Sequence, residues 1–287
     1  MNIQNNAMLC TLSTGMVGIN KTDKDISSEI ASAKSTTVES LKAIKSLFTK
    51  KDLSMIKMYQ TQARTIHNKY TLPWSDSGQR LLPCSVYPRY SKEMSDTIAR
   101  FDYAVNCFLD DYEKTIEQAQ ARLGDAFNHA DYPSQEQVKS RFRIVSKVQP
   151  MPKSDDFRTM ELSDADIQAV KKSYEIELSE KVADAVDSLV RSLYDAVKHM
   201  QTSLVEGKSF HESSFTKLKD ILALAPKLNI TNDPDITALI DRLELECNIH
   251  SFNVKDAREH IGYRNKMTTN YTNAVNDILE NFMGGVA

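Results

Sequence analysis

Hydrophobic residues recur at three- and four-residue steps along most of the chain, which is the pattern of helices with one buried face. The two longest runs cover Tyr90–Leu123 and Ile167–Leu204, and in both the mean step is about 3.7 residues. This spacing exceeds the 3.5-residue repeat of a left-handed coiled coil, so the two helices should pack nearly straight. We predict that they form a long antiparallel hairpin, because the roughly 40 residues between them allow the chain to return.

Shorter runs with the same periodicity predict further helices, and their ends carry recognisable signals. Ser163 and Asp233 are suited to cap the helices that follow them, Gly124 is a natural stop, and Pro226 should end the helix before it. The Thr36-Thr37 pair lowers helix propensity in its segment without breaking the helix. The predicted shorter helices are Asp25–Lys50, Asp52–Lys69, a short helix after Ser134, His211–Leu224, Pro234–Asn248 and Val254–Phe282.

Three segments, Met8–Ile19, Arg143–Gln149 and Arg80–Cys84, have the short, apolar pattern of strands. An isolated strand leaves backbone N–H and C=O groups unpaired, so we predict that the first two share one small sheet, with the third as a candidate member. The predicted fold class is therefore mainly α with a minor α+β part: a long antiparallel helical hairpin, extra helices and a small β-sheet.

We expect one elongated domain over residues 1–287. Its expected sub-regions are 1–90 (N-terminal strand, helical hairpin and Trp-containing corner), 91–206 (long helical pair with a strand) and 207–287 (C-terminal helices). A helix as long as Ile167–Leu204 would measure roughly 60 Å. Such a helix is longer than a compact core needs, so part of it should protrude or oligomerise.

The segment Tyr70–Tyr90 contains the only Trp of the chain and three of its eight Pro. Pro73 fixes an extended entry, and Gly78 suits a turn that requires positive φ. We expect Trp74 to fold back against the helices and to be largely buried. The first interpretation is a rigid structural corner, and a contact with a ligand or partner is the alternative.

Composition sets broad limits on function. Hydrophobic residues make up 41% of the chain and charged residues 26%, and the formal net charge is −3, so nothing global drives the protein toward nucleic acid or membrane. Residues 1–100 carry 14 Lys/Arg against 8 Asp/Glu, which leaves the remainder acidic. The four Cys are widely spaced, which favours reduced thiols in a cytosolic protein. No apolar run is long enough to span a membrane, and the N-terminus does not resemble a signal peptide.

Motifs for catalysis are missing from the sequence. There is no phosphate-binding glycine loop, and the six His are scattered without metal-ligand spacing. The acidic pair Asp184 and Asp187 interleaves with Lys and apolar positions, which is typical of a solvated helix face rather than of paired catalytic carboxylates. We therefore predict that the protein is not an enzyme and has no cofactor and no metal site.

A basic stretch in the first hundred residues is a candidate phosphate-binding surface. Glu39 and Asp52 interrupt it, and its aromatic residues follow the apolar periodicity, so core is their favoured role. Met55 and Met58 are likewise predicted to fill the core. The stretch consists of Lys42, Lys45, Lys50, Lys51, Lys57, Arg64 and Lys69, with Phe48, Tyr59 and Tyr70 interleaved.

The order of short motifs along the chain resembles the family called domain of unknown function 3150, which occurs mostly in bacteriophages and mobile elements. The resemblance starts with Thr-x-Pro-Trp and Gly-x-Arg-Leu-Leu-Pro before a long helix, and continues with a Tyr-Pro-Ser motif and an Arg-Phe that leads into a strand. It covers most of the chain. The matching residues are Thr71, Pro73, Trp74, Gly78, Arg80, Leu81, Leu82, Pro83, Tyr132, Pro133, Arg141, Phe142, Pro150 and Pro152.

The resemblance implies an accessory or adaptor role, because members of that family often lie near genes for MoxR-like ATPases and von Willebrand factor A proteins. We therefore expect a non-enzymatic interaction protein of a bacteriophage or mobile element, accessory to an AAA+ ATPase system in the bacterial cytoplasm. The alternatives are a virion or assembly component that homo-oligomerises through its long helices, and a nucleic-acid-binding or host-takeover factor. The family assigns no catalytic residues, so the candidate structural or contact residues are Trp74, Gly78, Arg80, Leu81, Leu82, Arg141 and Phe142.

Overall fold

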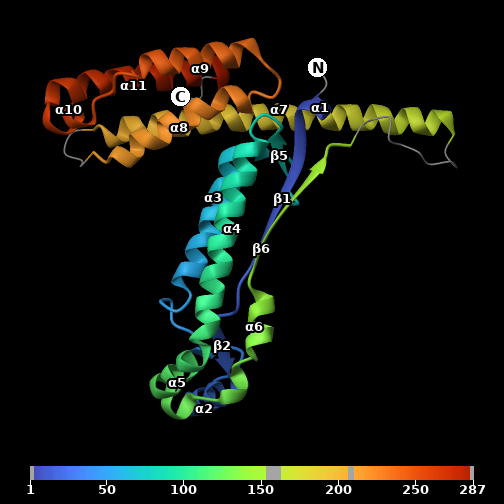
Figure 1. Cartoon of the computed structure of the whole chain (residues 1–287), viewed down its shortest axis with the longest axis vertical. Helices are drawn as coiled ribbons and strands as arrows, with labels where there is room; N and C mark the ends of the chain where they lie inside the picture. Colours follow the sequence, from blue (N-terminus) through green and yellow to red (C-terminus); the bar gives the residue numbers. More distant parts are fainter. Residues whose placement is uncertain (1–2, 153–162, 206–209, 285–287) are drawn as a thin grey trace. The chain divides into compact units, whose positions relative to one another are not determined.

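The computed structural model describes residues 3–152, 163–205 and 210–284, and these form a mainly helical protein with a small β part, as predicted (Figure 1). Contacts divide the chain into two units. Unit 1 comprises Met1–Thr11, Asn68–Pro88 and Val148–Ala287, and unit 2 comprises Leu12–His67 and Arg89–Lys147. The expected single domain stays a prediction. The sequence also predicts that Gly207 ends the longest helix, but this residue lies outside the described residues.

Unit 1 is built around the 40-residue helix α7, Asp164–Ser203. Ser163 caps it as predicted, accepting a hydrogen bond from the backbone N–H of Asp166. Helices α8 (Glu212–Leu228) and α11 (Ile261–Phe282) pack against it, and α9 (Pro234–Glu246) packs against both of these (Figure 1). The short helices α1 (Ile3–Asn6) and α10 (Val254–Glu259) complete the unit.

The predicted pairing of Tyr90–Leu123 with Ile167–Leu204 is wrong. The partners of α7 are α8 and α11, while the helices of the first segment belong to unit 2. A shared spacing makes two helices geometrically compatible, but it does not select one apolar face over another of the same period.

Two helix ends in unit 1 differ from the prediction. Pro226 lies inside α8, two residues before its last residue, so the helix continues past it although proline cannot donate a hydrogen bond to the carbonyl of Leu222. The predicted helix Val254–Phe282 is interrupted at His260, whose extended backbone (φ −116°, ψ 108°) separates α10 from α11.

The predicted sheet is confirmed. Its strands are β1 (Ala7–Gly15), β4 (Leu72–Pro73), β5 (Arg80–Pro83) and β6 (Arg143–Pro150), in the order β4-β5-β1-β6. β5 is antiparallel to both β1 and β4, with Leu9 opposite Leu81 and Leu72 opposite Leu81 on the other side. Strand β4 was not predicted, since two residues carry no periodicity.

The predicted helix Asp25–Lys50 is wrong. Helix α2 covers only Lys24–Ala33, and β3 (Ala43–Ser46) then pairs antiparallel with β2 (Asn20–Asp23). Ser35 has positive φ, 47°, and the N–H of Thr36 donates to the carbonyl of Ala31, which is the hydrogen bond that closes a helix with a left-handed residue. The Thr36-Thr37 pair therefore follows a break instead of continuing a helix.

The other helices of unit 2 follow the prediction closely. They are α3 (Ser54–Tyr70), α4 (Tyr87–Asp110), α5 (Tyr112–Leu123) and α6 (Gln135–Arg141), with two 3-10 turns, Gly124–Ala126 and His129–Asp131. Helices α4 and α5 meet at Asp111, but backbone hydrogen bonds from Asp111 to Cys107 and from Thr115 to Asp111 keep them nearly continuous. Gly124 ends α5 with φ 54°.

An aromatic cluster forms the core of unit 2. Phe48 is fully buried, and its ring meets those of Phe108 at 5.7 Å and Tyr132 at 5.8 Å edge to face. Such edge-to-face pairs add to the stability that burial alone provides. The aromatic cluster consists of Phe48, Phe108, Tyr112, Phe127, Tyr132 and Phe142.

Candidate interaction groove

Unit 2 contains a groove of about 570 Å³ between the N-terminal half of α3 and the junction of α4 with α5. Both walls are helices, so the groove has no free strand edge along its sides. We call it the α3–α4 groove. It is lined by Asp52, Met55, Ile56, Tyr59, Tyr103, Ala104, Cys107, Phe108, Asp111, Lys114, Thr115 and Gln118.

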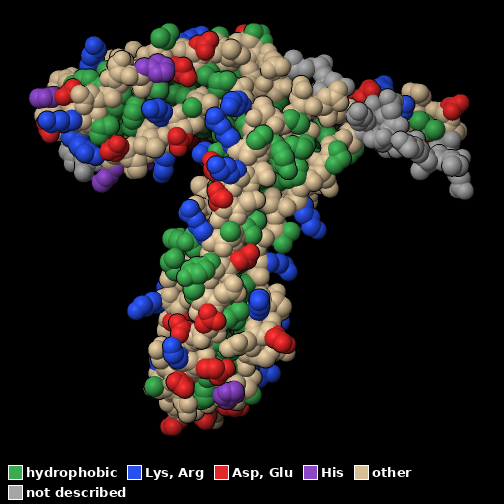
Figure 2. All heavy atoms as spheres, in the orientation of Figure 1, with side chains coloured by type: hydrophobic (Ala, Val, Ile, Leu, Met, Phe, Trp, Pro, Cys, Tyr) green, Lys and Arg blue, Asp and Glu red, His purple; other side chains and the backbone are tan. Residues whose placement is uncertain are grey.

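The apolar residues of the groove lie on the helix faces next to the buried faces of α3 and α4. On α3, Ile56 is buried, and Met55, next to it in sequence, has 52% of its surface exposed. On α4, Ala104 and Phe108 are buried and Tyr103 remains 73% exposed. The prediction that Met55 and Met58 fill the core is wrong, since both side chains are exposed. Figure 2 shows hydrophobic side chains gathered on the surface over this part of α3 and α4.

Soft and aromatic side chains dominate the exposed part of the groove. The thiol of Cys107 is free and exposed, and it lies beside Tyr103. A hydrogen bond with this thiol raises the pKa of Tyr103 above its ordinary value. Met side chains adapt their shape to a partner at low cost, and Tyr combines a large apolar ring with a polar end. This combination is typical of a protein-binding surface.

The charged residues of the groove are mainly acidic. Asp52 and Asp111 line it, with Lys114 as the one cation among the lining residues. Lys114 pairs with Asp111 at 2.8 Å, but both side chains are mostly exposed, so the pair is weak. Asp110 and Glu117 follow Tyr103 at seven-residue steps and are exposed, which places them along the same stripe of α4 and α5.

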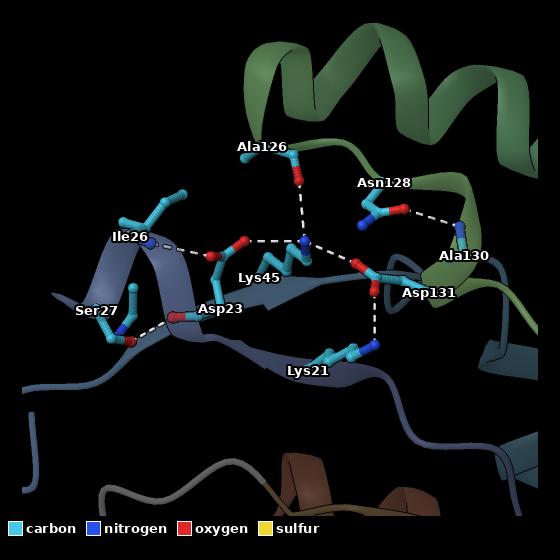
Figure 3. A network of polar contacts seen from close by, with 10 residues as sticks. Lys21, Asp23, Ile26, Ser27, Lys45, Ala126, Asn128, Ala130 and Asp131 are labelled. Carbon is cyan, nitrogen blue, oxygen red and sulfur yellow. Dashed lines mark hydrogen bonds and ion pairs between the residues drawn. The ribbon is translucent and has the colours of Figure 1, made fainter. Parts of the chain in front are cut away.

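A polar network in unit 2 joins the antiparallel strand pair β2 and β3 to the turns that follow α5 (Figure 3). Lys45 on β3 pairs with Asp23 at 2.9 Å and with Asp131 at 2.7 Å, and it donates to the carbonyl of Ala126 at 3.0 Å. Lys21 pairs with the other oxygen of Asp131 at 2.5 Å. The side chains of Lys45, Asp23 and Asp131 are each about nine-tenths buried, so their charges compensate one another away from water.

The pKa values of this network reflect its pairing. Hydrogen bonding to Lys45, and then to the N–H of Ile26, lowers the pKa of Asp23. Burial raises the pKa of Asp131, but hydrogen bonds from Lys21 and Lys45 outweigh it, so that pKa is also lowered. The pKa of Lys45 is raised by the same contacts. Lys45 therefore serves the fold and is not a free member of the basic stretch.

The motif residues of the Trp corner form a β-hairpin in unit 1. β4 and β5 are joined by a turn in which Gly78 has φ 85°, as predicted. The N–H of Trp74 donates to the carbonyl of Gln79. Trp74 is half-buried, with the Lys181 ammonium 5.8 Å from its ring, so the ring folds back against the protein as expected but is not fully enclosed.

Arg80 and its neighbours stabilise this hairpin. The guanidinium of Arg80 donates to the hydroxyl of Thr71 at 2.6 Å and to its carbonyl at 2.8 Å, and burial lowers the pKa of Arg80. Leu81 and Leu82 are fully buried. The hairpin residues of the motif are therefore structural, apart from the half-exposed Trp74.

Arg141 and Phe142 belong to unit 2, so the motif residues do not form one site. Phe142 packs edge to face on Phe108 in the aromatic cluster. The side chain of Arg141 is exposed, but its backbone lies close to Gly15. A Cβ at position 15 would come within 2.7 Å of the Arg141 carbonyl oxygen, so this approach of the two backbones requires glycine at position 15.

One pairing of a nucleophile with a base was not predicted. In unit 1 the hydroxyl of Ser214 on α8 lies 3.2 Å from Nε2 of His199 on α7. The pair is 15 residues apart in sequence on separate helices, so no local motif could reveal it. Ser214 is buried and also contacts Ser203, and neither Ser214 nor His199 lines any of the described pockets. We interpret it as a polar contact between helices.

Two further searches of the described residues concern metal ions and membranes. No three His, Cys, Asp or Glu side chains of these residues gather closely enough to hold a metal ion. Within the same residues, no helix has the length and apolar character needed to cross a bilayer. No family model, curated protein or solved structure matches the chain.

Proposed function

We propose that the protein is a non-enzymatic interaction protein, an adaptor of a bacteriophage or mobile element that assists an AAA+ ATPase system in the bacterial cytoplasm. The observation that carries the interaction role is the α3–α4 groove, where Met55 and Tyr103 expose most of their apolar surface beside acidic residues. Exposed Met and Tyr side chains around a hollow are typical of surfaces that a partner covers. The phage setting and the ATPase partner rest on the family resemblance.

The partner should depend on a few anchors in the groove. Tyr is among the residues that contribute most to binding free energy when a partner buries them, and most surrounding contacts contribute little. Tyr103 and Met55 are the two groove residues with the largest exposed apolar area. They are therefore the side chains whose removal should weaken association most.

The test is co-purification of the tagged protein with a co-expressed MoxR-like ATPase or von Willebrand factor A protein. We expect the wild-type chain to retain one of these partners at low salt and the double variant Met55→Ser/Tyr103→Ser to lose it. Leu245→Ser is the matched control, because Leu245 is an apolar side chain with 79% exposure on α9. Retention by the groove variant, or loss in the control, would contradict the proposal. The purified protein alone should show no ATPase or nuclease turnover.

A second candidate, a virion or assembly component, is favoured by one feature of α7. The buried residues of this 40-residue helix all lie between Ala185 and Met200. Its first half continues the apolar line through Ile167, Val170 and Leu178, each partly or largely exposed. An apolar helix face that the described residues of unit 1 leave partly open suits self-association.

Sedimentation velocity decides between these two roles. An assembly component should form concentration-dependent oligomers that Val170→Asp/Leu178→Asp disperses, and an adaptor should remain monomeric without its partner. The matched control is Ala169→Asp/Ser173→Asp, which places the same charges at exposed positions beside the apolar line of the same helix segment.

A further inference from the structure

The walls of the α3–α4 groove restrict the kind of segment that fits. Both walls are helices whose backbone groups are already paired within each helix, so an extended peptide would find no strand edge to hydrogen-bond to. A helical segment satisfies its own backbone and needs only a hollow for one row of side chains. A hollow between two helices is the usual seat for such a row.

The lining residues favour an apolar row as the part that enters. Ile56 and Phe108 form the buried base of the groove, and Met55, Tyr59 and Tyr103 stand beside it at least partly exposed. Flexible Met side chains, beside the Tyr rings, can adapt their conformation to pack around Leu-sized side chains of different shape. The groove therefore fits side chains that recur at three- and four-residue steps on an amphipathic helix.

The charge around the groove selects the polar flank of that helix. From Asp102 to Glu117 the α4–α5 wall carries five acidic residues and one basic residue, and all six are exposed. These are Asp102, Asp110, Asp111, Glu113, Glu117 and Lys114. The opposite wall carries Asp52 and Lys57, with Lys50 and Lys51 just before α3, so the acidic charge around the groove lies on the α4–α5 wall. Complementary charge steers association and excludes acidic partners.

We infer that the α3–α4 groove binds an amphipathic helix of a partner protein whose apolar row is flanked by Lys or Arg. This inference deepens the proposed function and rests on it, because it names the chemistry of the segment that the adaptor recognises. The groove takes Leu-like side chains against Met55 and Tyr103, while the flanking cations face Asp110, Asp111 and Glu117.

The chain contains its own reporter for this site. Cys107 lines the groove and is exposed, whereas Cys84 is exposed in unit 1 and lines a different pocket. Cys10 and Cys247 are buried. The rate at which a maleimide modifies Cys107, with Cys84 in the same molecule as the internal control, therefore measures occupancy of the groove.

The probe is an idealised amphipathic helical peptide of Leu and Lys, compared with a Leu/Glu peptide of the same pattern and with a scrambled Leu/Lys peptide. At about ten times its dissociation constant, the Leu/Lys helix should slow modification of Cys107 about tenfold. Modification of Cys84 should be unchanged, and the other two peptides should protect neither thiol. Equal protection of both thiols, or equal protection by the Leu/Glu or scrambled peptide, would overturn the inference.

Removal of the acidic flank tests the charge argument. Asp110→Asn/Asp111→Asn/Glu117→Gln should weaken the Leu/Lys helix about tenfold at low salt and reduce the dependence of its affinity on salt. The matched control Glu175→Gln/Glu177→Gln/Glu180→Gln removes three exposed acidic charges from α7 and should change neither quantity. An unchanged affinity in the groove variant would overturn the inference.

Two outcomes separate this inference from the proposed function. If modification of Cys107 slows as the concentration of the protein alone is raised, a second copy occupies the groove and the inference is wrong. If no peptide protects Cys107 while Met55→Ser/Tyr103→Ser still abolishes co-purification with the ATPase system, the groove binds a partner by other chemistry. In that case the inference fails and the adaptor role stands.

Discussion

Helices α4 and α5 present two apolar surfaces that unit 2 uses in different ways. On one, Phe108 and Tyr112 pack with Phe48 in the aromatic cluster, and the pKa of Tyr112 rises to about 12 because its phenol is buried. On the other, Tyr103 and Cys107 face the groove and stay exposed. The residue types are similar, so the difference lies in whether another element of the chain covers them. Covered aromatic residues stabilise the fold, and uncovered ones remain available to a partner.

The covered surface should dominate stability. Phe48→Ala removes a fully buried ring that contacts Phe108, Tyr112 and Tyr132, and it should cost about 3–5 kcal/mol of the free energy of unfolding. Phe48→Leu keeps most of the volume and should cost less than about 1.5 kcal/mol. Urea unfolding of the three proteins measures both values. Equal losses in the two variants would show that the volume of Leu recovers nothing and that the contacts of the aromatic ring carry the whole contribution.

The polar network should contribute less than the aromatic cluster, but in the same direction. Lys45→Met leaves the buried carboxylates of Asp23 and Asp131 facing each other with one shared cation removed, so the thermal unfolding midpoint should fall. The fall should be smaller than for Phe48→Ala, because Lys21 still pairs with Asp131. Lys42→Met, at an exposed position of the same segment, is the control and should leave the midpoint unchanged.

The contribution of the network should disappear in acid. Hydrogen bonds from Lys45 hold the pKa of Asp23 below its ordinary value of 3.8, and the pKa of Asp131 is lowered as well. A depressed carboxylate pKa adds stability above the ordinary value, and this stability is lost as the pH falls through the folded-state pKa. The difference in unfolding free energy between wild type and Lys45→Met should therefore be constant from about pH 7 to 5 and shrink below about pH 4. A difference that persists at pH 2 would assign the effect of Lys45→Met to packing.

The elements that sequence predicted well are those with local signals. The cap at Ser163 and the unbroken apolar line fixed α7 almost to the residue, and unpaired backbone groups were enough to bring β1, β5 and β6 into one sheet. The helix predicted over Asp25–Lys50 failed because pairing of β3 with β2 and the left-handed Ser35 outweighed a plausible periodicity. Local pattern cannot weigh a competing strand partner.

The groove shows how far a functional surface can be predicted from the sequence. Leu53, just before α3, and Ile56 on α3 are buried, and Met55 and Met58 are exposed, yet all four fit a helical apolar pattern. Which of two neighbouring apolar faces becomes the core depends on where α4 packs, and that information is tertiary. The motif residues Trp74 and Arg80 were visible in sequence because turns and prolines are local, but Arg80 stabilises a hairpin and Trp74 is half-buried beside Lys181.

We expect the smallest change in stability from substitution of Tyr103. This substitution tests most directly whether the covered and uncovered surfaces of α4 and α5 differ in role. Tyr103→Ala removes a ring that is 73% exposed, so the free energy of unfolding should change by no more than about 0.5 kcal/mol. Tyr112→Phe removes only a hydroxyl, but that hydroxyl donates to the carbonyl of Pro133 at 2.8 Å, so it should cost about 1 kcal/mol. Binding of the Leu/Lys helix should show the reverse order: Tyr103→Ala should weaken it by about tenfold or more, and Tyr112→Phe should leave it unchanged. If Tyr103→Ala instead lowers stability and leaves binding intact, the exposed ring is part of the fold and the two surfaces of α4 and α5 do not differ in role.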